Sequence, residues 1–202
     1  MLEKIRPIFT LALIAAIISG LVIVVYNFTY VDTSNIITDK QAAAVTAIYG
    51  GEKSDFEVVP LSTENENGDK VPTEIANKLS DKGISPAKVI KRTSDGSLAF
   101  EFLVKGYKSG FDIMVGVKDG KVEGVAIVSV GEETPGLGTN TNDPVFLDQF
   151  KGLDKKPVIK TTPKEGQVLV DGVTGATLSS KGVATAVRNA LDAYTAIGGE
   201  AQ

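Results

Sequence analysis

Cysteine and histidine are both absent from this chain of 202 residues, and their absence excludes several chemistries. Without cysteine there is no disulfide, no thiol nucleophile and no cysteine-held zinc or iron–sulfur site. Without histidine there is no histidine ligation of haem or zinc and no Ser-His-Asp triad. Carboxylate metal sites remain possible, but no EF-hand spacing occurs, so we expect no metal site. Any redox work would have to be carried by an organic cofactor.

An excess of positive charge is also missing, since the formal net charge is -4. Glu3, Lys4 and Arg6 precede a long apolar run and together contribute +1, so the remainder of the chain carries -5. A nucleic-acid partner would need a basic face. We therefore expect no nucleic-acid partner.

The apolar run begins near the N-terminus, and no charged residue occurs between Arg6 and Asp32. The stretch from Ile8 to Tyr26 is almost wholly apolar and, as a helix, would span roughly 28 Å, close to the thickness of a bilayer core. Aromatic residues cluster at its far end, as they do at a membrane interface (Tyr26, Phe28 and Tyr30). We predict a transmembrane helix over residues 8–30.

The orientation follows from the basic residues Lys4 and Arg6 at the near end of the run. The positive-inside rule places residues 1–7 in the cytoplasm and everything after about residue 31 on the other side of the cell membrane. A cleaved signal peptide is the competing interpretation, although the run is longer than a typical signal core and shows no clear small-x-small cleavage site. A buried soluble helix is a third, disfavoured because the run is apolar on all sides.

The remainder predicts one α+β domain in which helices pack on an antiparallel sheet. Turn signals separate apolar runs and predict a meander of about four strands, over 87–93, 97–105, 111–118 and 121–130. Shorter strands are expected over 56–60, 157–160 and 167–170, and polar loops over 62–70 and 132–142. Helices are expected over 38–49, 73–79, 144–150 and 179–197, the second-last capped by Asp143 and the last by Ser179 or Ser180 and stopped by Gly198-Gly199.

Two glycine-containing stretches stand out from this pattern. Asp171-Gly172-Val173-Thr174-Gly175-Ala176-Thr177 lies between a predicted strand and the last helix, where helix amides and the helix dipole favour a phosphate. On spacing alone, a tight turn with a helix cap is the commoner outcome. The second stretch is Glu133-Thr134-Pro135-Gly136-Leu137-Gly138, which by itself indicates an ordinary Pro-Gly turn.

Together the two stretches resemble the FMN-binding domain family. The first is similar to the flavinylation motif, in which an acidic residue leads Ser/Thr-Gly-Ala-Ser/Thr, and the second to the Glu-Thr-Pro-Gly-Leu-Gly loop of the same domains. The segment from Gly106-Tyr107 to Gly116, followed by residues 119–122, resembles the part that precedes this loop. The resemblance implies an FMN-binding domain over residues 97–198, preceded by 31–96 and followed by a tail of 199–202.

By this resemblance, Thr177 carries FMN through a phosphodiester, and a separate flavin transferase that reads Asp171 attaches it from FAD. Thr174, Gly175 and Ala176 would complete the attachment site. The resemblance also implies that the loop borders the flavin ring, through Glu133, Thr134, Gly136 and Leu137. Tyr107 is expected to be a core residue rather than a stacking one.

Two members of this family combine both motifs with a single N-terminal anchor. They are the G subunit of the membrane-bound, ion-translocating ferredoxin:NAD oxidoreductase (Rnf) complex and the C subunit of the sodium-pumping NADH:quinone oxidoreductase. The resemblance implies an electron relay outside the cytoplasm, with other membrane and iron–sulfur subunits as partners, and the chain length favours the Rnf complex. No general base or substrate pocket is evident, so no catalytic residue is expected. The alternatives are an FMN carrier outside such a complex, a flavin-free membrane-anchored scaffold and a secreted soluble protein.

Overall fold

The computed structural model describes residues 2–29, 35–66, 68–107, 110–131 and 133–197, which fall into two units. The first unit contains α1 (Leu2–Thr29), whose described large apolar side chains, from Leu11 to Phe28, are exposed. The side chains described in this helix are those of residues 10–26, 28 and 29. Within the described part of the chain, no helix is both long enough and apolar enough to cross a membrane.

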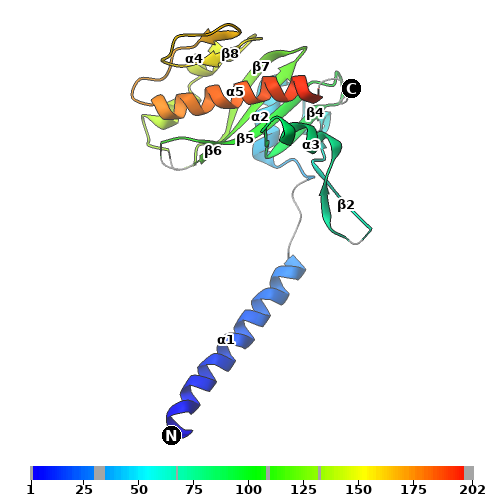
Figure 1. Cartoon of the computed structure of the whole chain (residues 1–202), viewed down its shortest axis with the longest axis vertical. Coiled ribbons are helices and arrows are strands. Elements are labelled where there is room, and N and C mark those ends of the chain that lie inside the picture. The colour runs from blue at the N-terminus through cyan, green and yellow to red at the C-terminus, as the bar shows by residue number, and fades with distance from the viewer. Residues whose placement is uncertain (1, 30–34, 67, 108–109, 132, 198–202) are drawn as a thin grey trace. The chain divides into compact units, whose positions relative to one another are not determined.

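The second unit, residues 34–202, is built on a five-stranded antiparallel sheet (Figure 1). The strand order is β1 (Phe56–Val59), β4 (Lys88–Arg92), β5 (Leu98–Lys105), β6 (Gly110–Lys118) and β7 (Lys121–Ser129). The predicted four-strand meander is confirmed, and β1 extends it by pairing with β4. Asp119 and Gly120 join β6 to β7 with φ of 50° and 75°, the left-handed pair that a two-residue hairpin turn requires.

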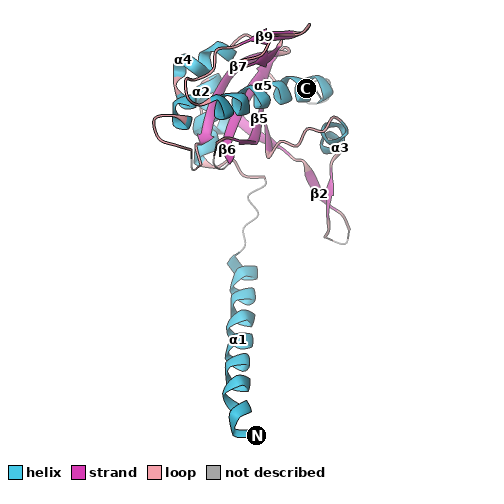
Figure 2. Ribbon diagram, turned by 60° about the vertical axis from the view of Figure 1, so that its left-hand side comes forward, coloured by secondary structure: helices cyan, strands magenta, loops and turns pink. Residues whose placement is uncertain are grey.

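Two helices cover the sheet, α2 (Asp39–Tyr49) against β6 and β7, and α5 (Thr177–Ile197) against β5 and β6 (Figure 2). Side chains along β6 alternate between two cores, as the period of a strand dictates. Ile113 and Val115 belong to the larger core, which contains the apolar stripe of α5, and Met114 belongs to the smaller core beneath α2. The alternation places the two helices on opposite faces of the sheet.

The position of α5 on the sheet is set at Gly182. A Cβ atom at this residue would lie 2.9 Å from the carbonyl oxygen of Lys105 in β5, so the helix backbone approaches the strand more closely than any side chain permits. Val183 and Val187 lie fully buried beside it. The N-terminal turn of α5 is therefore held at a fixed height above the sheet.

Smaller elements complete the second unit. They are the 3₁₀ turns Lys53–Asp55, Gly138–Asn142 and Asp148–Phe150, the helices α3 (Glu74–Asp81) and α4 (Pro144–Leu147), and the parallel pair β8 (Lys156–Val158) and β9 (Gln167–Leu169). The Asp143 side chain caps α4, as predicted. The strand predicted over 157–160 ends at Val158, because Lys160 adopts the left-handed conformation with φ 52°.

Two local predictions were wrong. The segment predicted as a polar loop forms a hairpin of β2 (Ser62–Glu64) and β3 (Lys70–Pro72), whose exposed strands bury no apolar face that a pattern could reveal. The last helix begins at Thr177, so Ser179 and Ser180 lie inside its first turn rather than at its cap. The predicted helix stop at Gly198-Gly199, the tail 199–202, Glu132 and residues 30–34 lie outside the described residues.

Candidate functional site

A cavity of about 500 Å³ opens where the loop after β7 meets the start of α5. Its wall comes from three segments that are distant in the sequence: Tyr107, the loop residues Thr134, Leu137 and Gly138, and residues 175–179. Both stretches singled out in the sequence therefore meet at one site. The volume lies within the range of about 300–1,000 Å³ that is usual for ligand pockets.

Tyr107 corrects one prediction. It was expected in the core, yet its side chain is 67 % exposed and lines the cavity. The residue follows the end of β5, where the chain has left the sheet. An aromatic face is thus available to a ligand in this cavity.

Glycine at position 175 allows the two stretches to close on one another. Gly175 has φ 79°, and a Cβ atom there would lie 2.9 Å from Cδ2 of Leu137. Any other residue would strain the backbone and push Leu137 away. Leu137 itself is 44 % exposed and forms part of the cavity wall.

The turn before α5 is fixed by Ser180. Its hydroxyl donates to the carbonyl oxygen of Ala176 at 2.9 Å and accepts from the N–H of Val173 at 3.0 Å. The N–H of Ser180 donates to the same Ala176 oxygen at 2.9 Å. Because Ser180 is fully buried, this small network holds residues 173–176 in one conformation immediately before Thr177.

Thr177 is the first residue of α5 and lies half-buried in the cavity wall. Its hydroxyl oxygen accepts a hydrogen bond from the ammonium of Lys160 at 2.9 Å. Sequence reasoning missed Lys160, which lies 17 residues earlier in a segment predicted as a plain strand. A positive charge next to the hydroxyl suits the binding of an anion at this position.

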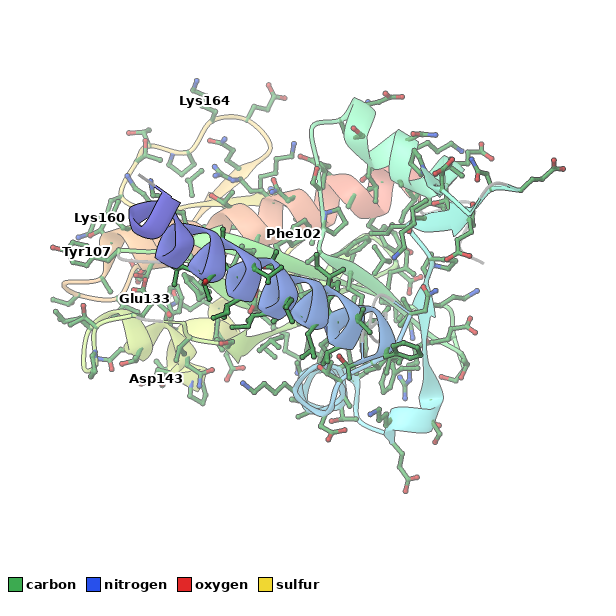
Figure 3. All side chains as sticks on the ribbon, turned by 90° about the horizontal axis from the view of Figure 1, so that it is seen from below. Phe102, Tyr107, Glu133, Asp143, Lys160 and Lys164 are labelled. Carbon is green, nitrogen blue, oxygen red and sulfur yellow. The ribbon has the colours of Figure 1, made fainter. Side chains whose placement is uncertain are left out.

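Glu133, labelled near Tyr107 in Figure 3, joins three segments around the cavity. The side chain is 5 % exposed, and its carboxylate accepts from the N–H of Tyr107 at 2.9 Å and from the hydroxyl of Ser179 at 2.6 Å. Gly106 and Gly138 pack so closely against the carboxylate that a Cβ atom on either would collide with it. The predicted site residue Glu133 thus links two residues of the cavity wall, Tyr107 and Ser179, through hydrogen bonds.

Three further predicted residues, Thr174, Gly136 and Asp171, are not among the described residues that line the cavity. Thr174 and Gly136 are exposed. Asp171 is also exposed, while its backbone is held at both ends by the side-chain amide of Gln149, with distances of 3.1 Å and 3.3 Å. The Asp171 carboxylate is therefore presented to solvent from a fixed backbone.

Comparisons with known proteins agree with this geometry. Residues 106–192 match the FMN-binding domain family. The G subunit of the Na⁺-translocating ferredoxin:NAD⁺ oxidoreductase complex of Acetobacterium woodii is 28 % identical over 200 residues, covering 94 % of this chain and 92 % of its own. The G subunit of the ion-translocating oxidoreductase complex of Methanosarcina acetivorans is 28 % identical over 194 residues, covering 96 % of each chain.

A third relative matches over a shorter stretch. The C subunit of the Na⁺-translocating NADH-quinone reductase of Vibrio alginolyticus is 43 % identical over 60 residues, covering 25 % of this chain and 23 % of its own. The chain thus contains an FMN-binding domain and is similar along nearly its whole length to the G subunits of ion-translocating oxidoreductase complexes.

Proposed function

We propose that this protein relays electrons through an FMN covalently attached to Thr177, as the flavoprotein G subunit of an ion-translocating ferredoxin:NAD oxidoreductase complex. One observation carries the proposal: the Thr177 hydroxyl lies at the start of α5, in the wall of a cavity that both motif stretches build. The near full-length similarity to two G subunits supports the complex to which the protein is assigned.

The residues of the cavity fit FMN. Tyr107, Leu137 and Leu178 offer aromatic and aliphatic faces to a flat ring, and all three are exposed in the described structure. The Thr177 hydroxyl offers a point of attachment, and Lys160 brings a positive charge to it. The phosphate would also meet the N-terminal end of a helix of 21 residues, where the helix dipole favours negative charge.

When bound, FMN supplies the redox chemistry, and this chain supplies attachment, orientation and surroundings. Gly175 lets Leu137 of the loop pack closely against the turn before Thr177, while Glu133 links the lining residues Tyr107 and Ser179 by hydrogen bonds. The exposed Asp171 carboxylate remains available to a flavin transferase. Thr134 contributes a polar group to the wall on the loop side.

We further propose that residues 8–30 anchor the protein in the cell membrane, with residues 1–7 in the cytoplasm and the FMN domain outside. The support lies in the sequence, where no charged residue occurs between Arg6 and Asp32, and in the exposed apolar side chains of α1. Covalent attachment suits this location, because a reversibly bound flavin would be lost to a space without a flavin supply. The expected partners are the other membrane and iron–sulfur subunits of the complex.

A second candidate is the C subunit of a sodium-pumping NADH:quinone oxidoreductase, which the local 43 % identity favours. The two assignments share the flavin and differ in the neighbouring subunits. Affinity purification from detergent-solubilised native membranes separates them by the identity of the co-purified proteins. A colourless protein from cells that contain an active flavin transferase would instead support the flavin-free scaffold.

Intact mass of the protein from carbonate-washed membranes tests attachment and anchoring together. We expect the full-length chain with one FMN, less one water, located by peptide mapping to the peptide that ends at Lys181. Thr177→Ala should fold and carry no covalent flavin, whereas the neighbouring hydroxyl variant Thr174→Ala should retain it. Covalent flavin on Thr177→Ala would refute the attachment site, and a chain lacking its first 20 to 30 residues would refute the anchor.

A further inference from the structure

Lys160 has a backbone conformation that the turn alone does not explain. Its φ of 52° lies in the left-handed region, which is strained for a residue that carries a side chain. Glycine would make the same turn without this strain. The described chain places glycine at many other left-handed positions, including Gly152 and Gly166 on either side of this segment. The reason for lysine at position 160 therefore lies in its side chain.

The ammonium of Lys160 is directed at one atom, the hydroxyl oxygen of Thr177 at 2.9 Å. Among the described residues, no carboxylate pairs with it. Lys156 offers a contrast in the same segment, because its ammonium lies 2.8 Å from the carboxylate of Asp192 on α5. One lysine thus neutralises a charge of the helix, and the other brings an unneutralised charge to the first residue of that helix.

We propose that Lys160 binds the phosphate of the flavin carried by Thr177 and so fixes the direction in which the flavin leaves the helix. The inference rests on the proposed function, since it needs a phosphodiester at Thr177. Esterification makes the Thr177 oxygen a poorer acceptor and places the anionic, non-bridging phosphate oxygens two bonds beyond it. A lysine ammonium on its flexible stem can follow that small displacement and form a charge-assisted hydrogen bond with them.

Lys160 is a positioning residue in this account. With the phosphate held between Lys160 and the first turn of α5, the flavin has fewer rotations available about its attachment. The ring is then directed toward the face that Tyr107 and Leu137 line. Without the cation, the flavin would remain attached through Thr177 but would sample more orientations.

The test uses the full-length protein in detergent, with purified flavin transferase and FAD. Covalent incorporation is followed by intact mass, and the freedom of the attached flavin is followed by fluorescence anisotropy. We expect Lys160→Gln to slow incorporation about five-fold and to lower the anisotropy, an effect of the size of one partly exposed charge-assisted hydrogen bond. Lys160→Arg should restore most of both values. The difference should shrink when salt is raised, because exposed charges are screened.

Two further variants distinguish a phosphate partner from a general effect of charge or turn geometry. Lys156→Gln removes an equal charge from the same segment and should match the wild type in both readouts. Lys160→Gly relieves the backbone strain, so it should melt no lower than the wild type and yet incorporate flavin as slowly as Lys160→Gln. Wild-type behaviour of Lys160→Gln and Lys160→Gly, or an equal defect in Lys156→Gln, would overturn the inference. Wild-type protein that acquires no covalent flavin would overturn the proposed function itself, and this inference with it.

Discussion

The starts of α2 and α5 are built in opposite ways. α2 begins with a closed capping box, in which the Thr38 hydroxyl accepts from the N–H of Gln41 at 3.4 Å and the Gln41 side chain accepts from the N–H of Thr38 at 2.9 Å. The residue before α5 is Ala176, whose methyl group can accept no hydrogen bond. Of these two helices, α5 begins at the cavity, and it is the one that lacks a capping side chain at the preceding residue.

Both helix starts are nevertheless held by a buried carboxylate, which comes from the strand β5 at α2 (Glu101) and from the loop after β7 at α5 (Glu133). At α2, Gln41 donates to Glu101 at 2.6 Å and accepts from Lys88 at 3.2 Å; burial raises the pKa of Glu101 and lowers that of Lys88. At α5, Ser179 donates to Glu133. The difference lies in the first turn, where a side chain caps α2 and the residue before α5 has no side-chain acceptor.

The largest effect on stability is expected from removing the Glu133 carboxylate, which holds the start of α5. Glu133→Ala leaves the Ser179 hydroxyl and the Tyr107 N–H without their acceptor and opens a hole beside Gly106 and Gly138. We expect the free energy of unfolding to fall by about 2–4 kcal/mol, measured by urea denaturation in detergent. The exposed Glu165→Ala serves as the control and should change it little. A loss below about 1 kcal/mol would mean that the start of α5 does not depend on this carboxylate.

A smaller effect, which arises from the last residue of α2, should appear at high pH. The Tyr49 hydroxyl donates to the carbonyl oxygen of Leu98 at 2.8 Å, and burial raises the pKa of this tyrosine above its ordinary value of 10.0. The folded state therefore keeps a proton that the unfolded chain loses, so stability is intact below pH 10 and declines above it, by about 1.4 kcal/mol per pH unit.

Urea titrations at pH 8 and pH 11 test this dependence on Tyr49. Tyr49→Phe should remove that part of the alkaline loss while costing about 1 kcal/mol at pH 8 for the lost hydrogen bond. Tyr194→Phe, on α5, controls for tyrosine removal as such. An alkaline slope that is unchanged in Tyr49→Phe would assign the loss to other groups.

The smallest effect comes from exchanging the two kinds of helix start. Thr38→Ala should lower the free energy of unfolding by about 1 kcal/mol with no effect on flavin incorporation. Ala176→Ser should supply a capping oxygen and raise stability by about 0.5 kcal/mol, while slowing incorporation because the hydroxyl competes for the amides. Thermal melts and intact mass give the two readouts. If Ala176→Ser incorporates flavin at the wild-type rate, incorporation does not require these backbone amides to be free.

Local patterns were sufficient to predict the four-strand meander and both helices that cover the sheet. Period-two runs and the Asp119-Gly120 turn predicted the meander, and the apolar stripe of α5 predicted its packing face. The motif residues Leu137, Gly175 and Thr177 do meet in one wall.

The contacts that organise the site could not be predicted in the same way. Glu133 reaches partners 26 and 46 residues away, and Lys160 reaches Thr177 over 17 residues. Such pairings depend on how the loops pack, about which the local order of residues carries no signal. The β2–β3 hairpin was missed for a related reason, because its exposed strands lack an apolar face.

The close contact between Gly182 and β5 also determines where the start of α5 lies. Five residues, or about 7.5 Å of helix, separate this glycine from Thr177. A side chain at position 182 would lift the first turn off β5 and swing Thr177 away from Lys160, although no group of the cavity had been altered. The position of the Thr177 hydroxyl is therefore set by one backbone contact in the core as well as by the loops that line the cavity.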